Sequence, residues 1–167
     1  PSRPARSGSG VPGSFQPDLV VVGSSTGGPQ TLHAILSQME GEGPVRTPIL
    51  LVQHMASGFT GPFAERLGAR GPFPWREAAD GEKVPLGTGL VAPGDHHLRL
   101  SRFTNRLTAH LDQEARVNSC RPAVDPLFQS AAELQGTNVL AIVLTGMGQD
   151  GLEGARHVRE AGGVVVV

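Results

Sequence analysis

Four short segments of the chain are rich in valine, isoleucine and leucine, residues that favour buried strands. They lie at 19–22, at the start of 49–55, at 139–144 and at 164–167. Each of the first three leads into a polar or glycine-rich turn, and a segment with helical spacing follows each turn. The pattern predicts buried strands that alternate with helices.

Apolar residues between these strands recur three and four positions apart, which places them on one face of a helix. Asp125 followed by Pro126 indicates a helix start, with the aspartate as N-cap and the proline as first residue. A last helix is expected at about 152–161. The predicted buried faces of the other three helices are Leu32, Ile35, Leu36 and Met39; Phe59, Phe63 and Leu67; and Leu127, Ala131 and Leu134.

Alternation of strand and helix predicts a doubly wound, mostly parallel sheet with helices on both faces, a Rossmann-like three-layer α/β fold. Residues 71–98 are rich in glycine, proline and charge, and they predict short strands and turns rather than another strand–helix unit. A small antiparallel hairpin region is expected around 85–111, with its turn at Thr104 and Asn105.

The composition limits the class of protein. A chain of 167 residues with a net charge of −1 is expected to be one domain, and it gives no electrostatic argument for nucleic acid or an anionic membrane. The single cysteine, Cys120, excludes an internal disulfide, and the longest apolar run is too short to span a membrane. Prolines and glycines predict a flexible linker or tail at 1–17, joined to a cytoplasmic domain at 18–167.

The turn after the first strand, Gly23-Ser24-Ser25-Thr26-Gly27-Gly28, has the most distinctive chemistry. Its glycines do not have the spacing of a dinucleotide-binding fingerprint, and no lysine precedes its hydroxyl residues as in a P-loop. The remaining interpretations are a hydroxyl nucleophile on a strand-to-helix turn or serines that cap the helix.

Three strands of the predicted sheet are followed by Ser24 and Ser25, by His54 and by the loop with Asp150. The carboxyl ends of parallel strands share one edge of a sheet, so these side chains are expected to meet there. An imidazole, with an ordinary pKa of about 6.5, can take a serine proton, and an aspartate can orient the imidazole. Alternatively, the histidine bonds to backbone and the aspartate caps the next helix.

A metal site has weaker support in the sequence. His96 and His97 with Asp95 could form half of one, but no paired histidine spacing or cysteine pair accompanies them. No metal and no organic cofactor is therefore expected.

Five motifs in order resemble the catalytic domain of the CheB-type protein-glutamate methylesterases of bacterial chemotaxis. The resemblance covers about residues 18–163. The motifs are Gly-Ser-Ser-Thr-Gly-Gly at 23–28, Gln-His-Met at 53–55 with Gly-Phe-Thr at 58–60, Ala-Pro-Gly-Asp at 92–95 with His-Leu at 97–98, Val-Asp-Pro-Leu-Phe at 124–128, and Leu-Thr-Gly-Met-Gly-Gln-Asp-Gly at 144–151.

The resemblance implies that Ser25 is the nucleophile, His54 the base and Asp150 the acid of a triad. The backbone N–H groups of Thr26 and Met147 are the expected donors to the oxyanion. The implied reaction is hydrolysis of γ-glutamyl methyl esters on the cytoplasmic helices of chemoreceptors, with release of methanol and some glutamine deamidation. Many members of the family also carry an N-terminal receiver domain that restrains the active site.

Two features depart from the family pattern: no receiver domain is present in the sequence, and the chain ends about one strand and one helix earlier than is usual. The interpretation is therefore a domain without its last strand and helix. Two alternatives remain: a serine esterase on other small or protein esters, and a non-catalytic α/β module that binds an anion or a partner.

Overall fold

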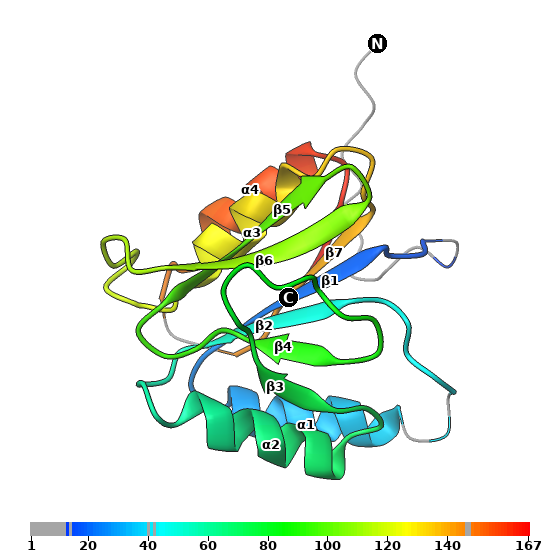
Figure 1. The fold of residues 1–167 in the computed structure, drawn as a ribbon, viewed down its shortest axis with the longest axis vertical. Helices are drawn as coiled ribbons and strands as arrows, with labels where there is room; N and C mark the ends of the chain where they lie inside the picture. Colours follow the sequence, from blue (N-terminus) through cyan, green and yellow to red (C-terminus); the bar gives the residue numbers. More distant parts are fainter. Residues whose placement is uncertain (1–12, 14, 40, 42, 146–147) are drawn as a thin grey trace.

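Six parallel strands form the central sheet of the protein in a computed structural model, which describes residues 13, 15–39, 41, 43–145 and 148–167 (Figure 1). The order across the sheet is β3-β4-β2-β1-β7-β8. A separate two-stranded antiparallel sheet is formed by β5 (His97–Phe103) and β6 (Arg106–Asp112). The parallel strands are β1 (Leu19–Ser24), β2 (Ile49–Gln53), β3 (Trp75–Glu77), β4 (Gly89–Val91), β7 (Val139–Val143) and β8 (Val164–Val166).

Helices cover both faces of this sheet, as Figure 1 shows. On one face lie α1 (Gly28–Gln38) and α2 (Thr60–Arg70). On the other lie α3 (Val124–Ala132) and α4 (Leu152–Glu160), with the β5–β6 hairpin packed against α3. The predicted doubly wound α/β fold is confirmed.

Two hydrophobic cores explain why the central strands are apolar at nearly every position. Side chains alternate along a strand, so Val21 lies in the core beneath α3 and α4, while Val22 lies in the core beneath α1 and α2. Leu50 and Leu51 divide between the two cores in the same way. A parallel sheet with both faces covered requires such continuous apolar runs.

Two residues assigned to buried helix faces are exposed. Ile35 is 40% exposed, whereas Leu32 and Leu36 are buried. Phe59 is 65% exposed because it precedes the first residue of α2, and Phe63 then begins the buried face. Helical spacing identified the faces correctly but extended each of them by one residue that lies at its margin.

The short strands predicted within 71–98 are present as β3 and β4, and the small antiparallel hairpin predicted around 85–111 is confirmed. Both β3 and β4 pair in parallel with the sheet, and the antiparallel hairpin is confined to 97–112. The strand β4 begins at Gly89, which lacks a side chain. The indole of Trp75 occupies the space that a Cβ at Gly89 would fill, so the glycine permits close packing of β3 on β4. The hairpin turn does lie at Thr104 and Asn105, as expected.

The strand order reverses at β1. After β1 the chain adds β2 on one side, and it later returns to add β7 on the other side. Ligands of open α/β sheets bind outside the carboxyl ends of the strands at such a switch point. The turns that follow β1, β2 and β7 therefore mark the expected location of a site.

Most of the predicted linker, residues 1–12 and 14, lies outside the described residues. Among the helices that the structure does describe, none combines the length and the hydrophobicity needed to cross a bilayer.

The core beneath α3 and α4 provides a test of the fold. Phe128 is fully buried there, so Phe128→Ala removes a large side chain and leaves a cavity, which costs about 3–5 kcal/mol. Phe103, 85% exposed at the end of β5, is the matched control, and Phe103→Ala should change stability by no more than about 0.5 kcal/mol. Denaturant unfolding of both variants measures the difference; equal effects would contradict this packing.

Candidate active site

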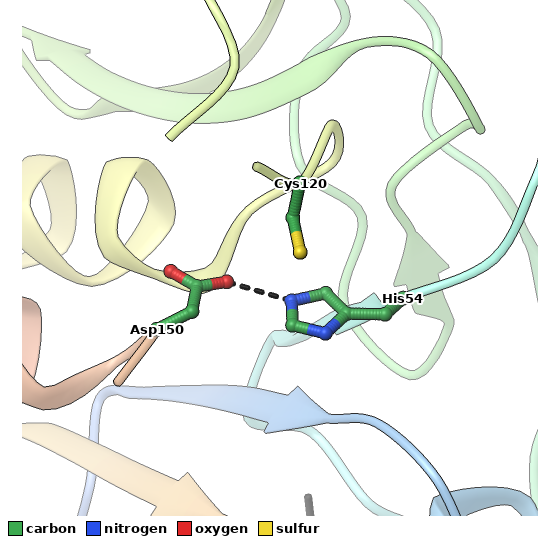
Figure 2. A group of neighbouring side chains, drawn as sticks. All are labelled: His54, Cys120 and Asp150. Carbon is green, nitrogen blue, oxygen red and sulfur yellow. Dashed lines mark hydrogen bonds and ion pairs between the residues drawn. The ribbon is translucent and has the colours of Figure 1, made fainter. Parts of the chain in front are cut away.

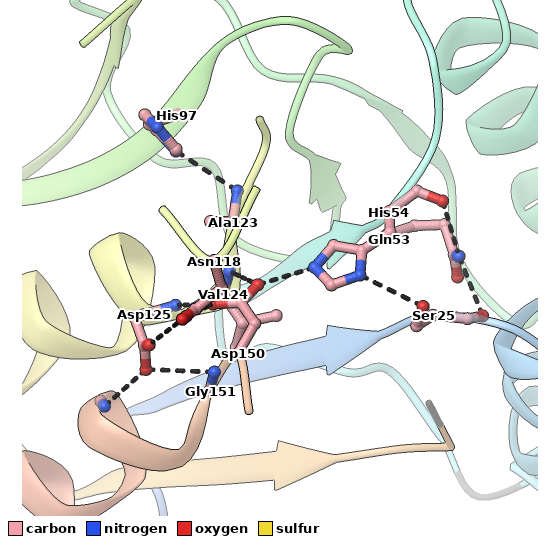
Figure 3. Close-up of polar contacts among 11 residues, drawn as sticks. Ser25, Gln53, His54, His97, Asn118, Ala123, Val124, Asp125, Asp150 and Gly151 are labelled. Atoms are coloured by element: carbon pink, nitrogen blue, oxygen red, sulfur yellow. Dashed lines mark hydrogen bonds and ion pairs between the residues drawn. The ribbon is translucent and has the colours of Figure 1, made fainter. Parts of the chain in front are cut away.

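Ser25, His54 and Asp150 meet at the carboxyl edge of the sheet, as the sequence predicted they would (Figure 3). Nδ1 of His54 lies 3.1 Å from Oγ of Ser25, and Nε2 of the same ring lies 2.6 Å from Oδ2 of Asp150. Three turns far apart in the sequence thus supply one continuous hydrogen-bonded chain of hydroxyl, imidazole and carboxylate.

Strand register places the serine beside the histidine. Ser24 pairs with Gln53 across β1 and β2, so the next residue on each strand emerges side by side. The N–H of His54 donates to the carbonyl of Ser24 at 3.0 Å, which extends the ladder by one bond. The amide of Gln53 donates to the carbonyl of Ser25 at 3.0 Å and fixes the turn from beneath.

The same contacts distinguish the two serines. The side chain of Ser24 is buried, and its hydroxyl donates to Oε1 of Gln53 at 2.8 Å. Only the hydroxyl of Ser25 faces the imidazole of His54. The structure therefore presents Ser25, and not Ser24, to the base.

The partners of the imidazole define its tautomer. A carboxylate only accepts hydrogen bonds, so Nε2 of His54 carries the proton and donates it to Asp150. Nδ1 then has a free lone pair, to which the hydroxyl of Ser25 donates. In the familiar serine-protease triad the two nitrogens have the opposite assignments. Here Nδ1, the nitrogen nearer the main chain, faces the serine because the two residues end adjacent strands.

The carboxylate of Asp150 is held by the first residues of α3. Oδ2 accepts the backbone N–H of Val124 at 2.7 Å, and Oδ1 accepts that of Asp125 at 3.1 Å. The side-chain amide of Asn118 donates to Oδ1 at 3.3 Å. The first N–H groups of a helix have no partner within the helix and favour negative charge, so α3 both satisfies and positions Asp150.

These donors also lower the pKa of Asp150. Burial alone raises it, since the side chain is only 4% exposed and the charged form loses hydration. The hydrogen bond from His54 and those from the helix N-terminus outweigh burial, so the pKa of Asp150 lies below its ordinary value. Asp150 is therefore ionised at neutral pH.

Asp125 has the reciprocal role, which corrects the prediction that it caps its own helix. The helix begins at Val124, and Oδ1 of Asp125 accepts the N–H groups of Gly151 and Gly154 at 3.1 and 2.7 Å. It thus caps α4, while Asp150, next to the start of α4, caps α3. Proximity of the two helix starts makes the exchange possible, and no pattern in the sequence indicates that proximity.

The two expected oxyanion donors are the backbone N–H groups of Thr26 and Met147, and the structure describes only the first of them. The N–H of Ser25 is already used, since it donates to the carbonyl of Thr145 at 3.0 Å. Within the described part of the chain, the N–H of Thr26 donates no hydrogen bond. Met147 lies outside the described residues. A cavity of about 120 Å³ lies beside Ser25 and His54 and is large enough for a small group at the serine.

The half-site of Asp95, His96 and His97 has a structural role instead. Oδ1 of Asp95 accepts two hydrogen bonds from the guanidinium of Arg121, and this contact ties the 113–121 loop to the turn before β5. His97 is fully buried, with its ring bonded to the carbonyl of Ala115 and the N–H of Ala123. Asp95 and His97 thus hold neighbouring segments of the chain together.

Three further residues at the site were not predicted to take part: Gln53, Asn118 and Cys120. Asn118 lies in a tight turn, closed by reciprocal backbone hydrogen bonds between Val117 and Cys120. Its φ of 50° lies in the left-handed region, which asparagine adopts more readily than most residues. The asparagine itself is therefore the only local signal in the sequence for this turn. Burial raises the pKa of the Cys120 thiol, and the charge of Asp150 adds to that effect.

Together these features define a doubly wound α/β protein with a hydrogen-bonded Ser–His–Asp set at the carboxyl edge of its parallel sheet. The chain belongs to the CheB methylesterase family, whose model matches residues 20–167.

Relatives of known name agree with this assignment. The chain is 44% identical, over 95% of its length, to the protein-glutamate methylesterase/protein-glutamine glutaminase of Maricaulis maris, and 45% identical, over 88%, to that of Halobacterium salinarum. It covers 39% and 42% of those proteins, so it spans about two-fifths of their length. The solved Thermotoga maritima CheB methylesterase catalytic domain matches with a TM-score of 0.84 and 41% identity over 90% of this chain and 78% of that one.

The lowered pKa of Asp150 predicts an acid-dependent contribution to stability. Unfolding returns Asp150 to its ordinary pKa near 3.8, so its hydrogen bonds contribute fully above that pH and are lost as the pH falls through the lower folded value. Asp150→Asn should destabilise the protein by about 1–2 kcal/mol at pH 7.

Urea unfolding from pH 7 to pH 3 measures this contribution. The difference between the wild-type protein and Asp150→Asn should begin to shrink near pH 4, where the unfolded chain takes up a proton that the folded carboxylate does not, and it should be lost as the pH falls through the lower folded-state pKa. A difference that is constant over the whole range would show that the ionised form is not favoured by folding.

Proposed function

We propose that this chain hydrolyses γ-glutamyl methyl esters on proteins and releases methanol by a Ser–His–Asp acyl-enzyme mechanism. The observation that carries the proposal is the hydrogen-bonded chain from Ser25 through His54 to Asp150. Membership of the CheB methylesterase family and the names of the relatives support the same reaction and add glutamine deamidation to it.

In the first half of the reaction, Oγ of Ser25 attacks the ester carbonyl as Nδ1 of His54 takes its proton. The lowered pKa keeps Asp150 ionised, so the imidazolium that forms lies against a fixed negative charge. His54 then gives the proton to the departing methoxide. The ester C–O bond breaks, methanol leaves and the acyl group remains on Ser25.

In the second half, water replaces the serine as nucleophile. Nδ1 of His54 takes a proton from water as its oxygen attacks the acyl carbon. The bond to Oγ of Ser25 breaks, the serine recovers its proton and a glutamate side chain is released. A primary amide would follow the same steps with ammonia as the leaving group, which is the deamidation in the relatives' names.

Backbone N–H groups are proposed to hold the negative charge on the carbonyl oxygen. Thr26 is the best candidate of the described residues, because it follows the nucleophile and its N–H donates to none of them. Met147 is kept as the second donor on the strength of the family resemblance alone. Loss of one such donor costs about 100-fold or more in rate.

The proposal extends to substrate, partner and place of action. The methylated helical region of methyl-accepting chemotaxis receptors is the proposed substrate, and the cytoplasm the proposed location. Residues 18–167 would form the catalytic unit, preceded by a linker at 1–17, with an N-terminal receiver domain as regulator. The small cavity beside Ser25 is consistent with a single side chain presented by a partner protein.

Labelling of the serine tests the nucleophile. A fluorophosphonate should modify Ser25, and Ser25→Ala should abolish both the label and the release of methanol from methylated receptor. Ser24→Ala is the matched control: it loses one buried hydrogen bond, worth about 1 kcal/mol, and should still be labelled. Peptide mapping that places the label on Ser24 would contradict the proposal, as would unlabelled active protein.

Replacement of the carboxylate tests the rest of the chain of hydrogen bonds. Asp150→Asn removes the charge beside the imidazole and can reverse its tautomer, so kcat should fall by about 10³–10⁴-fold. The rate of methanol release should fall without a comparable change in KM, and circular dichroism should confirm a folded protein. Near-normal turnover in a folded variant would remove Asp150 from the mechanism.

A further inference from the structure

Cys120 lies across the site from the sheet, with its sulfur directed toward the His54 ring and Asp150 (Figure 2). One ligand atom from each of these three residues, Sγ, an imidazole nitrogen and a carboxylate oxygen, lies within 4.8 Å of the other two. In the described ranges this is the only such group of three potential metal ligands. The hydrolytic mechanism uses His54 and Asp150 but gives Cys120 no task.

We propose that Cys120, His54 and Asp150 form a reversible binding site for a thiophilic divalent cation of the zinc class, and that occupation of this site blocks the hydrolase. The inference that the ion binds is based on the geometry of these three side chains. Only the inhibition rests on the proposed function.

The donor set selects the class of ion. One thiolate, one imidazole and one carboxylate are all ligands of zinc, whereas magnesium and calcium take oxygen ligands and avoid sulfur. Three protein ligands leave a fourth tetrahedral position for water, and the adjoining cavity of about 120 Å³ has room for one.

The ligands need only small movements. Zinc bonds of about 2.0–2.3 Å in a tetrahedron place neighbouring ligand atoms roughly 3.3–3.5 Å apart. Nε2 of His54 and Oδ2 of Asp150, now 2.6 Å apart, must separate to admit the ion, and the sulfur must approach. Reciprocal backbone hydrogen bonds between Val117 and Cys120 close the turn of Cys120, and the N–H of Val124 at the start of α3 holds Oδ2 of Asp150. The three side chains therefore converge without prior folding of a loop.

Occupation changes the proton on each ligand in a defined way. The thiol of Cys120 releases its proton to solvent and binds the ion as thiolate. Nε2 of His54 gives up its hydrogen bond to Asp150 and donates its lone pair to the ion, so the ring proton moves to Nδ1. One proton leaves for each ion bound. Nδ1 can then only donate toward Ser25, and the base needed for hydrolysis is lost.

Cobalt(II) is the probe that reports this site directly. Cys120 is the only cysteine of the 167 residues, so a near-ultraviolet thiolate-to-cobalt charge-transfer band can arise from no other side chain. Titration of the whole chain with Co²⁺ alone should produce this band at one equivalent, and Zn²⁺ should abolish it by displacement. Absence of the band with Co²⁺ in excess would overturn the proposal.

Two variants separate the site from other histidines and from the catalytic reaction. Cys120→Ser should abolish the band and weaken binding of Zn²⁺ at least about tenfold, since a thiolate ligand is lost. Ser25→Ala removes the nucleophile but no ligand, so its band should equal that of the wild-type protein. Equal Zn²⁺ affinity in the wild-type protein and Cys120→Ser would exclude Cys120 as a ligand.

Inhibition is measured on methylated receptor. Zn²⁺ should stop methanol release, EDTA should restore it, and Cys120→Ser should need at least about tenfold more Zn²⁺ for the same effect. The same inhibition curve for both proteins would overturn the inhibitory role. If no methanol is released even without metal, the proposed function fails, while the cobalt spectra still decide whether the site exists.

Discussion

The exchange of caps between α3 and α4 is the interaction on which the rest of the site depends. Asp150, just before α4, accepts the first N–H groups of α3, while Asp125, within α3, accepts N–H groups at the start of α4. Each carboxylate satisfies donors that burial would otherwise leave unpaired, at a cost of about 1–3 kcal/mol for each group. Because the two helices hold one another in this way, the position of Asp150 follows from the packing of a whole face of the sheet. Only one further contact, to His54, is needed to connect that face to the chemistry of the serine.

The serine and the histidine depend on a different constraint, the register of two adjacent strands. Pairing of Ser24 with Gln53 places Ser25 and His54 next to each other whatever their side chains do. Gln53 then fixes the turn by a bond to the carbonyl of Ser25. The site therefore depends on two contacts of His54. Strand register determines its contact with Ser25, and the packing of α3 against α4 determines its contact with Asp150. This arrangement explains why Nδ1 of His54 faces the serine. Nδ1 bonds to Ser25 at the end of the neighbouring strand, and Nε2 bonds to Asp150, which the two helices hold in place.

This division also explains what could be predicted from the sequence. Apolar runs at 19–22, 49–52 and 139–144 identify buried parallel strands, and the rule that their carboxyl ends share an edge was sufficient to bring the Ser24–Ser25 turn, His54 and Asp150 together. The choice of Ser25 over Ser24 came from the family resemblance alone. The crossed caps could not be predicted, because Asp125 before Pro126 is equally suited to cap its own helix, and the choice depends on how α3 lies against α4. Short strands were expected within 71–98, but their parallel pairing with the main sheet could not be predicted, because it depends on contacts in space such as that of Gly89 with the ring of Trp75. Exposure of Ile35 and Phe59 shows that helical spacing alone does not locate the margin of a buried face.

Saturation of Asp150 has a consequence for any ligand of this site. Its two oxygens already accept His54, Val124, Asp125 and Asn118, so the carboxylate is oriented before a substrate arrives. Such preorganised charge can stabilise an imidazolium without rearrangement at the moment of reaction. A cation that binds between His54 and Asp150 must instead displace the shared proton, and the loss of that hydrogen bond opposes its binding. The same hydrogen bond that prepares the site for catalysis therefore limits the affinity for a metal ion. The contribution of Cys120, whose sulfur has no part in the catalytic network, then decides whether an ion can compete.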